Sequence, residues 1–234
     1  MSKLRTECLG RTYEDRVVAL RDVTIEIRTG DIAVVLGPSG SGKTTLLNLL
    51  ATLDAPTEGS VWLDDIELTR LSDRQASRIR SERFGFVFQF FHLLPELTVL
   101  ENVLLPLWIR DGNPLKRDLY RAEASRLLEE FGLAHRKDAL PRRLSGGEMQ
   151  RVAICRSLVC GPEVIFADEP TGSIDRDSAE LFCAAVQQLN AHKGVTFVIA
   201  THNERFLQFA TKIVYLRDGS VAGVEERNLH RERE

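Results

Sequence analysis

Several features are missing from this 234-residue sequence, and each absence narrows the class to which it can belong. No apolar run reaches the length of about 18 residues that a membrane-spanning helix needs, so we expect no transmembrane segment. The first residues, Met1 to Glu7, lack the apolar core of a signal peptide, and we therefore expect a cytoplasmic protein. A net charge of −3 provides no global field that would attract nucleic acid or anionic lipid.

Cysteine is also scarce, and its spacing matches neither a CxxC motif nor a zinc site. No CxxC pair occurs, and no cysteine or histidine cluster has the spacing of a zinc site. The four residues are Cys8, Cys155, Cys160 and Cys183. We predict free, buried thiols in a reducing compartment.

With 43 % hydrophobic and 28 % charged residues, and no repeat, low-complexity tract or linker, the composition is typical of a soluble globular protein.

A glycine-rich stretch, GPSGSGKT, runs from Gly37 to Thr44 and fits the phosphate-loop pattern. The apolar run 31–36 precedes it and a helical pattern over 45–51 follows, which is the context that this motif requires. Glycines let successive N–H groups surround an anion, and the helix start adds its positive dipole end. We predict that Lys43 reaches the outer phosphates of a nucleotide and that Thr44 ligates Mg²⁺. The predicted nucleotide-binding residues here are Gly37, Pro38, Ser39, Gly40, Ser41, Gly42, Lys43, Thr44 and Thr45.

Two adjacent carboxylates, Asp168 and Glu169, follow the apolar run 164–167 directly. A carboxylate at the end of a buried strand is where nucleotide-hydrolysing proteins hold Mg²⁺, and Asp168 suits that role. Glu169 lies one residue further, where it could act as a base toward an attacking water molecule. A strand ending in Asp-Glu is commonplace, but together with a phosphate loop it predicts a hydrolytic site.

Periodicity divides the remaining chain into two kinds of region. Alternating apolar residues predict strands at 23–28 and 60–65, so the first ~90 residues are expected to hold strands and a single helix. Helical spacing recurs at 98–110, 115–131 and 148–158. The chain then alternates strands with one more helix and ends in a hairpin at Asp218-Gly219. This alternation predicts a largely parallel sheet. The later strands are expected at 164–167, 195–200 and 213–216, and the helix at 177–189.

The stretch Leu144 to Arg151, LSGGEMQR, resembles the signature of ATP-binding-cassette (ABC) ATPases. Ser145 is also a good N-cap for the helix that follows, and an open helix start prefers anions. In that family, the signature residues Ser145, Gly146 and Gly147 would contact the γ-phosphate held by the loop of a partner subunit. The resemblance therefore implies a head-to-tail homodimer that encloses ATP between two copies.

Further positions match the same family in the expected order, from about Tyr13 to Gly223. The resemblance implies that Gln89 contacts the metal and the water, and that His202 holds the γ-phosphate and orients Glu169. It assigns Asp175 to a loop at the dimer interface and implies that the ring of Tyr13 stacks on adenine. The implied catalytic group is Lys43, Gln89, Glu169 and His202, the implied metal ligands are Thr44, Gln89 and Asp168, and the cofactors are ATP and Mg²⁺.

The pattern GFVFQ-x-F-x-LLP, followed by LTVLENV and Pro106-Leu107, resembles the lipoprotein-release and macrolide-export subgroup. Ser173 departs from that subgroup, which usually has asparagine there. With no transmembrane segment, the chain is expected to act with separate permease subunits at the inner face of the cell membrane, without nucleic acid. An apolar cluster after Gln89 would either pack into the helical region or line a groove for a permease helix. Its members are Phe90, Phe91, Leu93 and Leu94.

The predicted fold is α/β, a P-loop ABC ATPase with a mostly parallel core sheet, N-terminal antiparallel strands and an inserted helical lobe. We expect one domain over 1–234, with a catalytic core at 1–89 and 159–224, a helical subdomain at 90–158 and a charged, frayed tail at 225–234. The expected function is to power export, or extrusion of lipoprotein, lipid or peptide. Two alternatives remain open, a regulatory ATPase that drives a force-transmitting membrane complex and an importer ATPase, whereas a DNA-repair ATPase is disfavoured by the short 90–144 segment.

Overall fold

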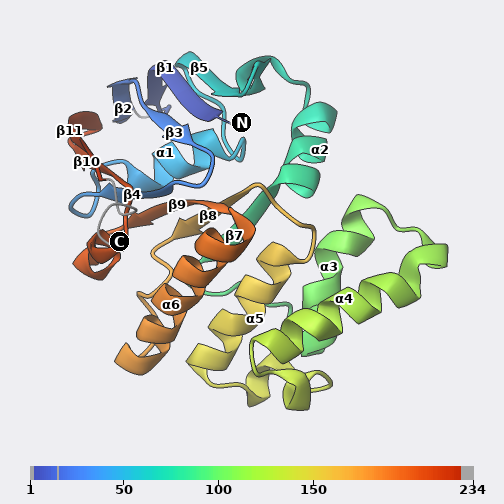
Figure 1. Ribbon diagram of the computed structural model, residues 1–234. Helices are drawn as coiled ribbons and strands as arrows, with labels where there is room; N and C mark the ends of the chain where they lie inside the picture. Colours follow the sequence, from blue (N-terminus) through green and yellow to red (C-terminus); the bar gives the residue numbers. More distant parts are fainter. Residues whose placement is uncertain (1–2, 15, 228–234) are drawn as a thin grey trace.

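The computed structural model describes residues 3–14 and 16–227, which form two sheets and a set of surrounding helices (Figure 1). The smaller sheet is antiparallel and is built almost entirely from the N-terminal part of the chain. Its strands run in the order β2-β1-β5-β6, with β3 also paired to β1. Its strands are β1 (Lys3–Thr12), β2 (Val18–Val23), β3 (Glu26–Arg28), β5 (Glu58–Leu63) and β6 (Ile66–Glu67).

The larger sheet has six strands in the order β11-β10-β4-β9-β8-β7. All neighbouring pairs are parallel except β10 and β11, which form the C-terminal antiparallel hairpin. Both faces of its centre are covered, and every residue of β9 is buried, as expected for parallel strands. Its strands are β4 (Ile32–Leu36), β7 (Phe84–Phe88), β8 (Val164–Asp168), β9 (Thr196–Thr201), β10 (Lys212–Arg217) and β11 (Ser220–Glu226).

The helices occupy the two faces of this sheet. Helix α1 lies between the two sheets, where its leucines share a core with Ala33 and Val35 of β4. The other face of β4, with Ile32 and Val34, packs toward α5 and α6 and onward to α3 and α4. The helices are α1 (Lys43–Leu50), α2 (Asp73–Arg83), α3 (Val99–Arg110), α4 (Arg117–Glu130), α5 (Gly146–Leu158) and α6 (Arg176–Lys193). Short 3₁₀ turns occur at Leu68–Arg70, Pro114–Lys116, Ala134–Arg136, Pro141–Arg143 and Glu204–Gln208.

The carboxyl ends of the parallel strands meet along one edge of the large sheet. Leu36 at the end of β4 pairs with Thr201 of β9, and Ala200 of β9 pairs with Asp168 of β8. Asp168 in turn pairs with Phe88 at the end of β7. Ligands of open α/β sheets bind outside this edge. The register therefore brings four segments that are far apart in the sequence to a single place.

The architecture confirms the predicted α/β fold, the antiparallel N-terminal strands, the mostly parallel core sheet and the C-terminal hairpin. Strands β1, β6 and β7 and helix α2 were not predicted, and because α2 lies in the N-terminal part the expectation of a single helix there was wrong. The strand expected over 23–28 is broken into β2 and β3. Residues 228–234, the greater part of the tail expected to fray, lie outside the described residues.

Cysteine burial differs from the prediction of buried thiols at three of the four sites. All four thiols are free, as expected, but Cys8 is exposed, Cys160 and Cys183 are half-buried, and Cys155 alone is fully buried. Burial in an apolar environment raises the pKa of the Cys155 and Cys183 thiols, which therefore remain protonated and unreactive at neutral pH. Among the described helices, none combines the length and the hydropathy needed to cross a bilayer.

Candidate nucleotide site

The phosphate loop joins β4 to α1, and its glycines have the conformations that close backbone approach requires. Gly40 and Gly42 have φ values of +78° and +99°, which a residue with a Cβ rarely adopts. A Cβ on Gly37 would lie 2.3 Å from the carbonyl oxygen of Leu216. Gly42 caps α1 without any side-chain hydrogen bond, and the first turn of the helix carries no acidic residue. The helix start is therefore open and electropositive, which favours an anion.

Lys43 is held at the mouth of this loop. Its Nζ donates hydrogen bonds to the carbonyl oxygens of Gly37 and Pro38 at 2.9 and 3.0 Å, and its side chain is only 8 % exposed. The same Nζ lies 3.9 Å from Oε1 of Glu169. A buried ammonium group that is bound mainly by carbonyl dipoles can be drawn toward a phosphate at little cost. The predicted Lys43 and Glu169 are thus brought together, although 126 positions separate them in the sequence.

Thr44 and Asp168 meet at the same point. The Thr44 hydroxyl donates a hydrogen bond to Oδ1 of Asp168 over 3.2 Å. Burial raises the pKa of Asp168 above its ordinary value, against the lowering effects of Thr44 and Lys43. A carboxylate that is partly desolvated and pairs with a hydroxyl is suited to a divalent cation, because oxygen ligands are the ones that Mg²⁺ prefers.

Glu169 is fixed by three contacts and by an unusual backbone. Its Oε2 accepts a hydrogen bond from the Thr201 hydroxyl at 2.9 Å, and its Oε1 lies 2.9 Å from Nδ1 of His202. Its backbone N–H donates to the carbonyl of Ala200. The φ of Glu169 is +42°, a left-handed conformation that is uncommon for a residue with a side chain. The His202 side chain is 71 % exposed, whereas that of Glu169 is 17 % exposed, so the imidazole covers a largely buried carboxylate.

Gln89 follows β7 and lies beside the segment after Glu169. A Cβ on Gly172 would lie 3.0 Å from Nε2 of Gln89, so the absence of a side chain at Gly172 makes room for this amide. The structure therefore places Gln89 at the same edge as Asp168, one strand away. Thr201 is the functional neighbour that the sequence reasoning missed. The register of β8 against β9 would have indicated it, since it places Thr201 beside the carboxylates.

The signature residues lie at the start of α5 and do not join the chain's own phosphate loop. Ser145 forms a capping box with Glu148, in which each side chain accepts from the other residue's backbone N–H. Asp175 caps α6 in a similar way by accepting from the N–H of Ser178. These two helix starts pack closely, because a Cβ on Gly147 would lie 2.2 Å from Oγ of Ser178. Their polar side chains are used within their own helix starts.

Gln150 ties the signature helix to the catalytic edge and was not predicted. Its side chain is 1 % exposed, and its Nε2 donates to the carbonyl of Pro170 over 2.7 Å. Pro170 directly follows Glu169, so the amide links the signature helix to the carboxylate segment. Within the signature motif, no pattern distinguishes this glutamine from an exposed one, so only the packing identifies it.

Tyr13 lies apart from the carboxylates, just beyond the end of β1. Its ring is 39 % exposed, and its hydroxyl donates to Asp54 over 3.2 Å. Asp54 follows the end of α1, the helix that begins at the phosphate loop. The predicted site residues therefore fall into three groups. One group lies at the sheet edge, one lies at the starts of α5 and α6, and Tyr13 lies alone near the small sheet.

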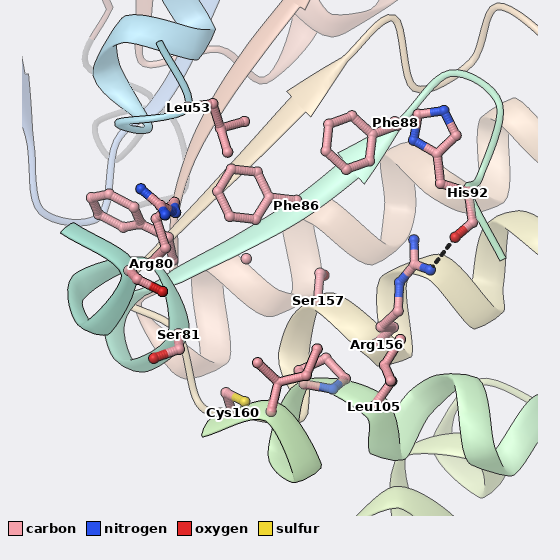
Figure 2. A pocket seen from close by; sticks show the side chains of 15 residues that line it. Leu53, Arg80, Ser81, Phe86, Phe88, His92, Leu105, Arg156, Ser157 and Cys160 are labelled. Carbon is pink, nitrogen blue, oxygen red and sulfur yellow. Dashed lines mark hydrogen bonds between the residues drawn. The ribbon is translucent and has the colours of Figure 1, made fainter. Parts of the chain in front are cut away.

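A groove of about 400 Å³ opens beside β7 (Figure 2). Phe86 and Phe88 project into it from the strand, and Arg156 of α5 donates hydrogen bonds to the backbone carbonyls of Phe91 and His92 at its end. The lining is mostly apolar and includes no carboxylate. It is formed by Leu53, Ser77, Arg80, Ser81, Phe84, Gly85, Phe86, Phe88, His92, Leu105, Pro106, Ile109, Arg156, Ser157 and Cys160.

The apolar cluster after Gln89 is divided between packing and exposure, so the expected packing holds for two of its four members. Phe90 is 69 % exposed and Leu94 is 42 % exposed, whereas Phe91 is buried and Leu93 packs against the core. None of the four belongs to the groove lining given above. The ring of His92 lies tilted by 42° against that of Phe88, with 4.9 Å between the ring centroids, and His92 lines the groove.

Comparisons with known proteins agree with this geometry. Residues 20–172 match the family model described as "ABC transporter". A lipoprotein-releasing system ATP-binding protein, LolD, from Bordetella pertussis is 41 % identical over 219 residues, 92 % of this chain and 94 % of the relative. The ABC transporter ATP-binding protein MJ0796 from Methanocaldococcus jannaschii is 41 % identical over 230 residues, 97 % of each chain.

Solved structures of MJ0796 give the same picture in three dimensions. Its dimeric structure matches with a TM-score of 0.89 and 39 % identity, covering 96 % of this chain and 99 % of the other. A dimeric post-hydrolysis state bound to ADP and Pi matches with a TM-score of 0.88 and 38 % identity, with the same coverage.

Proposed function

Because this chain belongs to the ATP-binding family of ABC transporters, we propose that it is the subunit that powers export through separate membrane permease subunits. It binds and hydrolyses ATP. The observation that carries the proposed site is the meeting of Lys43 with Glu169 at 3.9 Å, where Thr201 and His202 hold the carboxylate. The likeness to LolD supports lipoprotein as the cargo class.

In the proposed nucleotide site, the residues at the sheet edge and Tyr13 bind different parts of the nucleotide and its metal ion. The open start of α1 and Lys43 would bind the β and γ phosphates, and the ring of Tyr13 would stack on the base. Thr44 and Asp168, with Gln89 beside them, would hold Mg²⁺, which when bound neutralises phosphate charge. Glu169 would take a proton from the attacking water, and His202, whose Nδ1 lies 2.9 Å from Oε1 of Glu169, would orient the carboxylate.

The second copy in this proposal supplies Ser145, Gly146 and Gly147. At this helix start Ser145 is exposed, Gly146 is half-buried and Gly147 is buried, and the Ser145 side chain is engaged in the capping box with Glu148. A head-to-tail homodimer would bring this start, with Asp175 beside it, to the γ-phosphate bound by the other copy. The dimeric structures of the relative MJ0796 support this arrangement.

The groove beside β7 is the proposed contact with the permease, which would keep the protein at the inner face of the membrane. Its three phenylalanine rings and the two arginines in its lining suit a short helix with apolar anchors. We further propose that residues 90–158 act as a helical subdomain that shifts relative to a catalytic core formed by 1–89 and 159–224. Such a shift would couple hydrolysis to the permease.

Replacing Glu169 tests the catalytic assignment. Glu169→Gln should lower ATP turnover by about 100-fold or more, because the amide cannot accept the proton, while ATP binding measured by calorimetry is retained. Gel filtration with ATP should then show a stable dimer. The matched control is Glu204→Gln, which alters an exposed glutamate near His202 and should turn over normally. Turnover of Glu169→Gln near the wild-type rate would overturn the assignment of the base.

Purification of the assembled membrane complex tests the direction of transport. A permease with a large extracytoplasmic domain, and release of lipoprotein from vesicles on addition of ATP, would support the proposal. A permease that binds a solute-binding protein would identify an importer instead. ATP hydrolysis that activates an envelope enzyme without moving any substrate would identify the force-transmitting alternative.

A further inference from the structure

Three side chains form a compact cluster around the proposed base-stacking residue. The guanidinium carbon of Arg11 lies over the ring of Tyr13, 4.6 Å from its centroid. An Nη of Arg11 pairs with Oδ1 of Asp54 at 2.8 Å, and the Tyr13 hydroxyl donates to the other oxygen of the same carboxylate. The Nε of Arg11 is buried and has no hydrogen-bond partner in the described chain. The ring contact and the ion pair are therefore what hold this arginine in place.

The cluster is joined to the phosphate loop through two routes. Arg11 on β1 pairs with Leu20 on β2, and a Cβ on Gly42 at the start of α1 would lie 2.8 Å from the Leu20 side chain. Asp54 lies four residues beyond the last residue of α1, so the far end of the same helix holds the carboxylate. Through Arg11 and Asp54, Tyr13 is thus connected to segments at both ends of α1, the helix that begins at the phosphate loop.

We propose that Arg11 and Asp54 are positioning residues that hold the Tyr13 ring ready to stack on the nucleotide base. This inference rests on the proposed function, in which Tyr13 contacts the base. One face of the ring is covered by the guanidinium, so the opposite face receives the base. The exposure of the ring, 39 %, is consistent with one open face.

Holding the ring in advance strengthens binding, because the ordering of a side chain otherwise opposes association. The gain concerns the bound nucleotide in its ground state and in its transition state alike. We call the pair of Arg11 and Asp54 the clamp. Loss of the clamp is therefore expected to raise KM and to leave kcat unchanged. A ligand that carries phosphates but no base gains nothing from the clamp, and this separates positioning of Tyr13 from a direct effect of the Arg11 charge.

The experiment replaces Arg11 by methionine and measures two ligands by calorimetry, ATP and inorganic tripolyphosphate. Arg11→Met should weaken ATP binding by about three- to tenfold, the range expected when one side chain must be ordered on binding. It should raise KM by the same factor, with kcat and tripolyphosphate affinity unchanged. Asp54→Asn should act in the same direction, and Arg11→Lys, which keeps the charge and the Asp54 pair, should recover part of the loss.

The chain offers a matched control on the same strand. Arg5 lies over the ring of Trp62, also 4.6 Å from the ring centroid. Arg5→Met removes a cation–π contact of equal geometry outside the proposed site, and it should leave both affinities and KM unchanged. A comparable loss of ATP affinity in Arg5→Met would show that weakened packing of β1, and not positioning of Tyr13, explains the effect and would overturn the proposal.

A double-mutant cycle with Tyr13→Ala completes the test. In that background Arg11→Met should cause no further loss of ATP affinity, because there is no ring left to position. If the loss persists there, or extends to tripolyphosphate, Arg11 acts through its charge and the clamp is refuted. Unchanged ATP affinity in Arg11→Met refutes the clamp alone. Unchanged ATP affinity in Tyr13→Ala would instead refute the stacking role in the proposed function, and the clamp with it.

Discussion

The starts of helices α1 and α5 are both anion-favouring, yet the chain builds them differently. At α1, Gly42 leaves the helix end without a side-chain cap, and the buried Lys43 adds a positive charge. At α5, Ser145 and Glu148 satisfy each other's backbone N–H groups, so that end is stable without a ligand. The N–H groups at the α1 start therefore need a bound anion as their partner. The α5 start is already capped by side chains of its own chain and can contact a second copy without rearrangement.

The largest expected effect comes from blocking the α5 start. Ser145→Arg should reduce ATP turnover by more than about 100-fold, because the long side chain would occupy the space of the γ-phosphate bound by the other copy. Nucleotide affinity of the isolated subunit, measured by calorimetry, should remain at the wild-type value. Thr98→Arg is the matched control, since Thr98 and Glu101 form an equivalent capping box at α3. Normal turnover in Ser145→Arg would contradict the two-copy site.

An intermediate effect is expected at the α1 start. Lys43→Ala should weaken ATP binding by about 10- to 100-fold, because a charge-assisted bond to phosphate is lost. Calorimetry of the isolated subunit measures this directly. Lys137→Ala, which removes an exposed lysine from the region between α4 and α5, serves as the control. Unchanged affinity in Lys43→Ala would mean that the two helix starts do not differ in the way described.

The smallest effect concerns the capping box of α5. The backbone N–H of Ser145, with Arg136 in support, holds the pKa of Glu148 below its ordinary value of 4.5. A lowered pKa contributes stability that is present above pH 4.5 and is lost as the pH falls through the lowered value. Glu148→Gln should therefore be less stable than the wild type at pH 7 by about 0.5 kcal/mol. The difference should shrink as the pH falls below 4.5.

Urea denaturation at a series of pH values measures this difference. Glu129→Gln, at an exposed position on α4, is the control and should follow the wild type throughout. A difference that stays constant from pH 7 to the acid limit would show that the charge of Glu148 plays no part in capping α5.

The sheet edge could be predicted from the sequence because its chemistry lies in local motifs. GPSGSGKT, the Asp168-Glu169 pair and His202 each come at the end of an apolar run, and parallel strands necessarily end on the same side. The structure brings these segments together as expected. Strand β1 escaped because its residues, Lys3 to Thr12, mix charged and polar side chains without regular alternation. Helix α2 escaped because it buries only Ala76 and so has no apolar stripe.

Contacts between distant side chains were beyond the reach of the sequence. Arg11 and Asp54 are 43 positions apart, and nothing in either local pattern distinguishes them from solvated charges. The residues after Gln89 show the same limit. Their hydrophobicity indicated an apolar surface, but it was the fold that buried Phe91 and exposed Phe90.

The hydrophobic core on the α5 side of the large sheet continues without interruption from Val34 through Val152 to Val103 and Leu127. The inserted helices therefore share one hydrophobic core with the strands and are not attached through a flexible linker. Any tilt of these helices must proceed as a small sliding of interlocked side chains. A chimera that borrows residues 90–158 from another cassette would consequently need matching residues on β4 and β8 as well.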